Sequence, residues 1–328
     1  MTRHEFVRQL IPGLTAAPGT CGTGSAPVNI ALAKYWGKRD SELNLPRNSS
    51  LSVALPSLGT RTRVILIDGP QDRVTLNGQP APEGFTRRLS AWLDLFRPAG
   101  AAFEVETENS VPTAAGLASS ASGFAALARA LDDLFDWQLD ARTLSMLARI
   151  GSGSASRSLF DGFAVWHRGE RDDGLDSWAE PLPQRWPALR IGLVEVDVTQ
   201  KPVGSTAGMT RTVDTCPLYD AWPDFAERCV RDLTAAIEAR DMEKLGEIAE
   251  HNALTMHATM IATRPPVLYW IPESVAAMQR VWALRQAGTG VWFTMDAGPN
   301  LKLLFEADAR PAVVAAFPDL RIIAPFAP

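Results

Sequence analysis

The stretch VPTAAGLASSASGF at residues 111–124 gives the strongest indication of the fold. Small residues leave its backbone uncovered directly before a helix in which Leu127, Leu131 and Leu134 fall on one face. Free N–H groups and the dipole at a helix N-terminus favour an anion, and Ser119 and Ser120 add hydroxyls suited to phosphate or Mg²⁺. No Gly-Lys-Ser/Thr follows, which excludes the phosphate loop of P-loop NTPases. On the residues alone, a tightly packed helix start is an equal alternative.

Around this stretch the first half of the chain mixes strands and helices. Alternating or β-branched apolar residues predict strands, and helical spacing predicts helices. Pro56, Ser57 and Gly59 predict a hairpin or a crossover between two of the strands. The expected strands are 28–32, 50–56, 61–67, 72–78, 103–107 and 163–167, and the expected helices are 84–96, about 117–134 and 140–150. Residues 1–25 are expected to form a short helix followed by a flexible segment rich in Gly, Thr, Ser and Pro.

An aperiodic, proline-rich segment near 180–190 predicts a domain boundary. The second half is then expected to contain strands at 191–198, 291–295, 301–305 and 321–324, with helices at 221–240, 241–262 and 273–286. Strands and helices mix without strict βαβ alternation, so the fold class is α+β. A length of 328 residues suits two domains.

Composition excludes several classes of protein. Lys and Arg number 32 against 37 Asp and Glu, a net charge of −5 that argues against a general nucleic-acid binder. No apolar run reaches the roughly 18–20 residues that span a bilayer, and the first residues lack the apolar core of a signal peptide. Three cysteines without metal or disulfide spacing suit a reducing compartment. We therefore expect a cytoplasmic protein without nucleic-acid or membrane partners.

Three further stretches carry groups capable of chemistry. Lys34, Lys38 and Arg39 surround Tyr35 and Trp36, which by themselves favour a solvated basic turn over a phosphate site.

In residues 152–157, SGSASR, hydroxyls and glycine precede Arg157, whose planar fork can hold a carboxylate or phosphate. Asp296, in the sequence MDAGPN between two apolar strands, is by itself best interpreted as part of a hairpin turn.

Residues 112–127, PTAAGLASSASGFAAL, resemble the phosphate-binding loop of the GHMP kinase superfamily, whose pattern is close to P-x-x-x-G-L-x-S-S-A. Within that superfamily, six other stretches resemble the diphosphomevalonate decarboxylase family in the same order. They are APVNIALAKYWGKRD (26–40), LNLPRNSSLSV (43–53), GSGSASRSLFDGFAVW (151–166), GSTAGM (204–209), HATMIATRPPVLYW (257–270) and MDAGPNLKLLF (295–305). The resemblance runs from about residue 26 to the C-terminus.

The resemblance implies a two-domain GHMP kinase fold with the active site in the cleft between the domains. The N-terminal domain, 26–187, would resemble a domain of a ribosomal protein, and the C-terminal domain, 188–328, would be ferredoxin-like and carry the catalytic aspartate. Residues 1–25 would be an extension that the chemistry does not need. The family also implies a homodimer.

The activity implied is ATP-dependent decarboxylation of (R)-5-diphosphomevalonate to isopentenyl diphosphate, ADP, phosphate and CO₂, a step of the mevalonate pathway of isoprenoid biosynthesis. Mg²⁺ would accompany ATP. Asp296 would accept the proton of the substrate's tertiary hydroxyl, and Arg157, Asn29 and Lys34 would complete the catalytic group. The alternatives are a sister activity, namely 5-phosphomevalonate decarboxylase or mevalonate 3-kinase, and a non-catalytic phosphometabolite-binding homologue.

The binding residues implied by the family fall into two sets. The substrate would contact Tyr35, Trp36, Gly37, Lys38, Arg87, Ser152, Gly153, Ser154, Ala155, Ser156, Arg157, Ser205 and Thr206. ATP would contact Thr113, Ala114, Ala115, Gly116, Leu117, Ala118, Ser119, Ser120 and Ala121, with Ser120 also on Mg²⁺. Ser156 replaces the cysteine that is usual in the family, which is a conservative departure.

Overall fold

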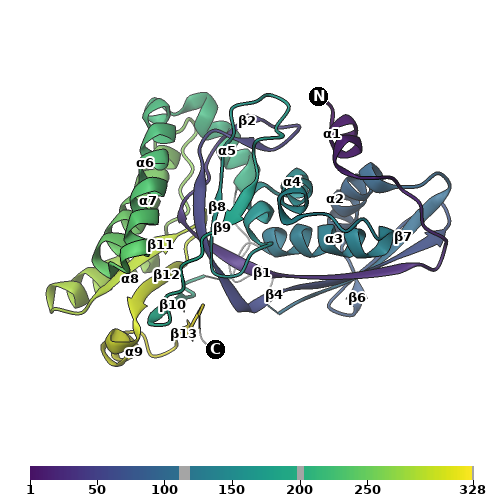
Figure 1. Cartoon of the computed structure of the whole chain (residues 1–328). Coiled ribbons are helices and arrows are strands. Elements are labelled where there is room, and N and C mark those ends of the chain that lie inside the picture. The colour runs from purple at the N-terminus through teal and green to yellow at the C-terminus, as the bar shows by residue number, and fades with distance from the viewer. Residues whose placement is uncertain (111–118, 198–202, 327–328) are drawn as a thin grey trace.

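The computed structural model describes residues 1–110, 119–197 and 203–326 (Figure 1). Its first half is built on a seven-stranded sheet with the order β6-β5-β7-β4-β8-β9, in which β1 also pairs with β4. The strands are β1 (Cys21–Ala33), β4 (Ser50–Asp68), β5 (Arg73–Leu76), β6 (Gln79–Pro80), β7 (Ala101–Asn109), β8 (Phe163–Trp166) and β9 (Ala179–Pro181). A separate hairpin pairs β2 (Lys38–Asp40) with β3 (Leu45–Pro46).

The two strands expected at 50–56 and 61–67 are one continuous strand, β4. Both of its ends pair with the long strand β1, and the pairing shifts register between Pro27 opposite Gly59 and Val28 opposite Leu55. Pro56 therefore belongs to a bulge and not to the turn that its residue types predict. Gly59 serves close approach, since a Cβ there would lie 2.4 Å from the Ala26 carbonyl oxygen.

Helices α2 (Glu83–Leu93), α3 (Ser119–Phe135) and α4 (Ala141–Gly151) pack on the first sheet together with α1 (Arg3–Leu10). Gly22 and Gly24 let β1 approach α3, because a Cβ at either position would lie within 2.2 Å of a backbone oxygen of that helix. The expectation that 1–25 is a short helix with a flexible tail is therefore half wrong. The helix is present, but residues 21–25 belong to β1.

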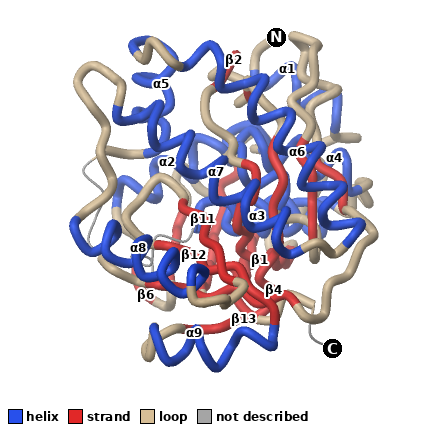
Figure 2. The backbone as a smooth tube through the Cα atoms, turned by 90° about the vertical axis from the view of Figure 1, so that its left-hand side faces the viewer, coloured by secondary structure: helices blue, strands red, loops and turns tan. Residues whose placement is uncertain are grey.

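The second half of the chain forms a four-stranded antiparallel sheet in the order β11-β12-β10-β13. Its strands are β10 (Leu189–Val194), β11 (Val291–Met295), β12 (Leu301–Glu306) and β13 (Arg321–Ile323). The helices are α5 (Ser205–Thr215), α6 (Trp222–Ala239), α7 (Met242–Ile261), α8 (Pro272–Gln286) and α9 (Arg310–Ala316). Figure 2 shows α7 and α8 in front of these strands. The predicted helices of this half are confirmed to within one residue at each end.

The chain passes between the two sheets over residues 182–188, after β9 and before β10. One buried apolar cluster nevertheless contains residues of both halves, including Leu55 of β4, Phe163 of β8, Leu189 of β10 and Leu233 of α6. The α+β class is confirmed, and the two sheets share part of their core. Within the described ranges, no helix combines the length and the apolar character needed to cross a membrane.

Candidate active site

Asp296 lies directly after β11, between two buried lysines from different parts of the fold. Lys34, which follows β1, donates from Nζ to Asp296 Oδ1 at 2.8 Å, and Lys302 on β12 places its Nζ 3.2 Å from Oδ2. The lysine side chains are 2% and 3% exposed, whereas that of Asp296 is 29% exposed. The carboxylate is thus the member of this group that faces solvent, and the two halves of the chain meet at it.

The pKa values of Asp296 and Lys34 depend on the charges that surround them. Burial alone would raise the pKa of Asp296, but attraction to Lys34 and Lys302 outweighs it and holds that pKa well below its usual range. Burial lowers the pKa of Lys34 to about 8, although its attraction to Asp296 opposes the shift. His257 donates from Nε2 to the Asp296 carbonyl oxygen at 3.0 Å, and burial lowers the pKa of His257 to about 3. The histidine is therefore neutral and fixes the Asp296 backbone.

Asn29 and Arg157 form a second buried group beside the first. Arg157, in the 3-10 turn η2 (Gly153–Arg157), donates to Asn29 Oδ1 at 3.3 Å and to the Ser50 hydroxyl. Asn29 in turn donates to the Ser158 hydroxyl at 2.7 Å. Burial lowers the pKa of Arg157 to about 10, and attraction to Asp296 acts against this shift. A buried guanidinium of this kind can hold an anionic group.

Two polar atoms close to Trp166 lack hydrogen-bond partners in the described part of the chain. They are the Tyr35 hydroxyl and Arg157 Nε, and both are buried. Tyr35 packs edge-on against Trp166 at 4.8 Å between ring centroids, and Arg157 lies over the same indole at 6.0 Å. Burial raises the pKa of Tyr35, so its hydroxyl stays a donor. Buried donors without partners are costly unless a ligand satisfies them.

The segment from Trp36 to Lys38 is held by packing. Trp36 is 2% exposed, donates from its indole N–H to Thr212 at 3.0 Å, and accepts from the Tyr219 hydroxyl at 2.8 Å through its carbonyl. Gly37 has φ +104°, and a Cβ there would overlap the Tyr219 hydroxyl. Lys38 donates from Nζ to Asn44 Oδ1 at 2.6 Å. Trp36 and Gly37 thus place their neighbours, and Tyr35 and Lys38 supply the polar groups.

Hydroxyl groups connect η2 with the start of α3. Ser120 Oγ lies 3.4 Å from Ser152 Oγ, which lies 3.4 Å from Ser154 Oγ. Ser156 and Ala155 are fully buried, and the Ser156 hydroxyl donates to the Gly153 carbonyl oxygen.

The predicted phosphate-loop residues are only partly covered by the described ranges. Thr113, Ala114, Ala115, Gly116, Leu117 and Ala118 lie outside them. Ser119 is described only as the first residue of α3, and Ala121 is fully buried in that helix.

A cavity of about 310 Å³ adjoins Ser120. It is lined by residues of β4, β7, α2 and α3, among them Thr60, Thr62, Arg88, Thr107 and Phe124. Arg88 also lies over the Phe124 ring at 5.3 Å. Arg87 instead projects from α2 with its side chain 77% exposed, 4.0 Å from Glu83. The structure does not bring Arg87 to the group around Asp296.

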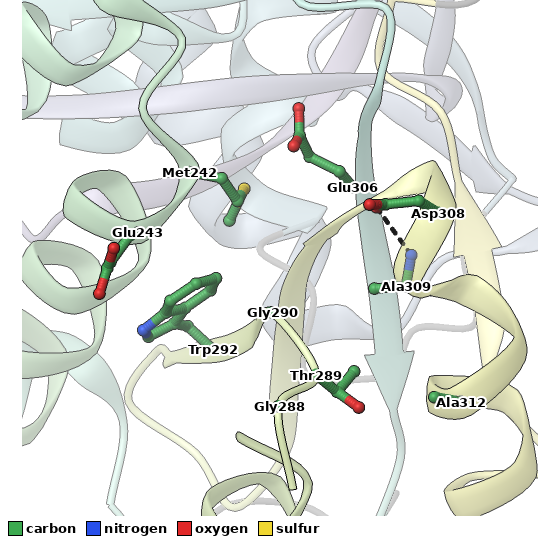
Figure 3. A pocket seen from close by; sticks show the side chains of 10 residues that line it. All are labelled: Met242, Glu243, Gly288, Thr289, Gly290, Trp292, Glu306, Asp308, Ala309 and Ala312. Carbon is green, nitrogen blue, oxygen red and sulfur yellow. Dashed lines mark hydrogen bonds between the residues drawn. The ribbon is translucent and has the colours of Figure 1, made fainter. Parts of the chain in front are cut away.

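Ser205 and Thr206 begin α5, whose Gly208 packs close to the Trp36 ring and the Tyr269 hydroxyl. A second cavity, of about 440 Å³, lies in the second half between Trp292, Thr289 and Asp308 (Figure 3). It contains none of the predicted site residues.

Sequence reasoning missed Lys302 and His257. Lys302 is the one charged residue in the apolar strand segment LKLLF, and a charge at a buried strand position is the signal that could have identified it. His257 had no such signal, because a single helical histidine is usually a packing residue.

A two-half α+β fold whose halves meet at one aspartate, beside a serine-rich helix start, defines a member of the GHMP kinase superfamily. Residues 26–179 match the family described as the diphosphomevalonate decarboxylase-like N-terminal domain, and residues 193–322 match the mevalonate 5-diphosphate decarboxylase C-terminal domain. The chain belongs to the diphosphomevalonate decarboxylase family.

Individual proteins of this family are similar over most of their length. The chain is 40% identical to the diphosphomevalonate decarboxylase of Aspergillus fumigatus over 86% of this chain and 76% of that protein. The mevalonate diphosphate decarboxylase structure from Staphylococcus aureus aligns with TM-score 0.88 and 39% identity, covering 93% and 95% of the two chains. A further structure, described as a complex with MVAPP, AMPPCP and magnesium, aligns with TM-score 0.87 and 40% identity, covering 92% and 96%.

Proposed function

We propose that this protein catalyses the ATP-dependent decarboxylation of (R)-5-diphosphomevalonate to isopentenyl diphosphate, ADP, phosphate and CO₂. The observation that carries the proposal is the placement of Asp296 between Lys34 and Lys302, with buried Arg157 near enough to interact with it electrostatically. The relative that carries MVAPP, AMPPCP and magnesium supports the same substrates for this chain.

The chemistry follows from the substrate. A tertiary hydroxyl is a poor leaving group, so ATP first phosphorylates it. The carbon–oxygen bond then breaks as the carboxylate on the neighbouring carbon leaves as CO₂, and the electron pair forms the double bond. Asp296 would orient the hydroxyl and accept its proton.

The basic groups would hold the anionic parts of the substrate. Arg157 Nε and the Tyr35 hydroxyl are buried donors without partners in the described ranges, and an anion between them would satisfy both. Asn29 fixes the arginine, and Lys38 would bind the diphosphate as a point charge. Ser152, Ser154, Ser205 and Thr206 would add hydroxyl donors.

ATP would lie along the start of α3, with its adenosine in the cavity lined by Thr62, Arg88 and Phe124. In the described ranges no cluster of three or more His, Cys, Asp or Glu side chains could hold a metal ion. Mg²⁺ commonly binds through phosphate oxygens and very few protein ligands, and the Ser120 hydroxyl fits that requirement. When bound, Mg²⁺ would neutralise charge on the transferring phosphoryl group.

The same proposal includes the division of the chain into halves, its oligomeric state and its location in the cell. We place the division of the chain at 187/188, with the active site where the halves meet. A homodimer and a cytoplasmic location are proposed from the family alone.

The test supplies ATP and Mg²⁺ with mevalonate, its 5-phosphate or its 5-diphosphate, and measures CO₂ and ADP. We expect CO₂ from the 5-diphosphate. Release from the 5-phosphate alone, or ADP from mevalonate without CO₂, would point to a sister activity. Nucleotide binding without any turnover would indicate a non-catalytic homologue.

Asp296→Asn tests the central residue. We expect kcat to fall by roughly 10²–10⁴, because the amide cannot accept the proton. The melting temperature should also fall, since two buried lysines lose their partner. Asp319→Asn makes the same change at an exposed position and should behave as wild type. Normal turnover in Asp296→Asn would disprove the catalytic assignment.

A further inference from the structure

Helix α1 lies outside residues 26–179, the N-terminal stretch that matches the family. It is nonetheless a well-built element. Thr2 and Glu5 form a reciprocal capping box at its start, with the Glu5 amide donating to Thr2 at 3.2 Å and the Thr2 amide donating to Glu5 at 2.8 Å. Phe6 and Val7 are fully buried against the first half of the chain. The helix therefore has a fixed position.

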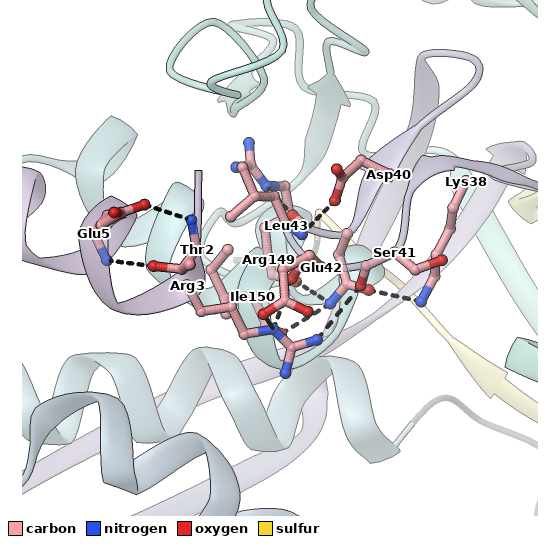
Figure 4. Close-up of polar contacts among 11 residues, drawn as sticks. Thr2, Arg3, Glu5, Lys38, Asp40, Ser41, Glu42, Leu43, Arg149 and Ile150 are labelled. Atoms are coloured by element: carbon pink, nitrogen blue, oxygen red, sulfur yellow. Dashed lines mark hydrogen bonds and ion pairs between the residues drawn. The ribbon is translucent and has the colours of Figure 1, made fainter.

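One side of α1 holds the turn between β2 and β3. Arg3 donates from Nε to the Glu42 carbonyl oxygen at 2.6 Å and from Nη2 to the Ser41 carbonyl oxygen at 3.4 Å (Figure 4). Its guanidinium also lies 3.7 Å from the Glu42 carboxylate. Inside the turn, the Leu43 amide donates to Asp40 Oδ1 at 2.7 Å. The turn backbone is thus bound by Arg3 of α1 and by Asp40 of the hairpin itself.

Arg149 of α4 contacts the same turn. Its guanidinium lies over the Phe6 ring at 5.0 Å and donates to the Leu43 carbonyl oxygen at 3.1 Å. Next to Leu43, the Asn44 amide donates to the carbonyl oxygens of Arg149 and Ile150 at 2.9 and 2.8 Å. Helix α1 thus supplies one support of the turn through Arg3 and contacts the other through Phe6.

Asn44 connects the turn to the predicted substrate site. Its Oδ1 accepts from Lys38 Nζ at 2.6 Å, and Asn44 itself has the left-handed φ of +53°. Burial lowers the pKa of Lys38, and repulsion from Arg3 and Arg88 lowers it further. An anion bound at Lys38 would relieve that repulsion.

We propose that α1 positions Lys38 for the diphosphate end of the substrate, with Arg3 acting through the Ser41–Asn44 turn. This inference rests on the proposed function. A lysine side chain has several freely rotating bonds, and a binding site gains affinity when that freedom is lost before the ligand arrives. Arg3 is a positioning residue that acts on binding, not on the chemical step.

Arg3→Ala is the test, with Arg8→Ala as the matched control because Arg8 is exposed in the last turn of the same helix. We expect the KM for 5-diphosphomevalonate to rise about 2- to 150-fold in Arg3→Ala, the range for coupled neighbouring residues. The kcat and the KM for ATP should stay close to wild type. Arg8→Ala should leave all three unchanged.

A double mutant separates positioning from general stabilisation. In a Lys38→Met background, Arg3→Ala should change KM much less than in wild type, since the residue it acts on is absent. Equal effects in both backgrounds, or a lowered melting temperature with an unchanged KM, would overturn the inference.

Calorimetric titration with inorganic diphosphate measures the same effect without turnover. We expect a larger Kd for inorganic diphosphate in Arg3→Ala than in Arg8→Ala. An unchanged Kd overturns the inference even if the enzyme is active. Absence of CO₂ release by the wild type, with the Kd difference present, would overturn only the proposed function.

Discussion

At the scale of single residues, Lys34 is a buried cation that retains its charge through one carboxylate. Its pKa is lowered to about 8 by burial, against the attraction of Asp296. The proposed reaction requires the charged form, which holds Asp296 and offsets the charge of the substrate. That form is lost as the pH rises through the pKa, so kcat/KM, which reports the free enzyme, should decline above about pH 8.

Lys34→Arg checks the origin of this decline, because even a buried guanidinium such as Arg157, whose pKa is lowered to about 10, stays charged well above the pKa of Lys34. We expect the decline to vanish in the variant even if its maximal rate is lower. The measurement is kcat/KM for the diphosphate substrate from about pH 6 to about pH 10. A decline that persists unchanged in Lys34→Arg would assign the titration to another group.

The residues of the site were predictable to different degrees. Asp296 and Arg157 stand in motifs whose order along the chain identifies the family, although the residue types alone favoured a turn for Asp296. Lys302 was not found, because strand periodicity says which face a residue occupies and not which charge it meets. Arg87 illustrates a third limit. Adjacent helix positions differ in direction by about 100°, so Arg88 lines the cavity while Arg87 faces solvent.

At the scale of secondary-structure elements, the helices of the second half could be located from sequence because their apolar periodicity is long and uninterrupted. The N-terminal segment could not. Its glycines indicate flexibility in isolation, yet Gly22 and Gly24 are strand residues that allow α3 to approach β1. Only the tertiary contact reveals that use, and it gives residues 21–25 a structural role, whereas the sequence-based expectation concerned the chemistry alone.

A chain that starts at Ser25 should therefore be destabilised. It loses α1, with fully buried Phe6 and Val7, and four residues of β1. Burial of each such side chain stabilises by about 1.5–3 kcal/mol, so we expect a loss of at least about 3 kcal/mol. Urea unfolding measures it, with a chain starting at Thr2 as the control, since that chain keeps the capping box. Equal midpoints for the two chains would contradict this prediction.

At the scale of the whole molecule, the aspartate and its first lysine come from opposite halves, so the site exists only when the halves are docked. The proline-rich segment lies where the chain passes from the first sheet to the second, but it does not indicate which core residues the two sheets share. The shared cluster around Leu55, Phe163, Leu189 and Leu233 joins them through apolar side chains that are buried in both. Such an interface favours cooperative unfolding over independent domains.

We expect the full chain to unfold in one calorimetric transition, and a fragment of residues 188–328 to show no cooperative melt of its own. Leu233 provides the point test, because it is fully buried in the shared cluster. Leu233→Ala should lower the free energy of unfolding by about 2–5 kcal/mol. The unfolding midpoint should fall equally whether Trp166 of the first half or Trp292 of the second half is kept as the reporter. Trp166 retaining its wild-type midpoint while Trp292 loses its own would show that the halves fold separately. In that case the site would be assembled by docking of preformed domains. Substrate binding would then stabilise the docking of the two halves and not the folding of either half.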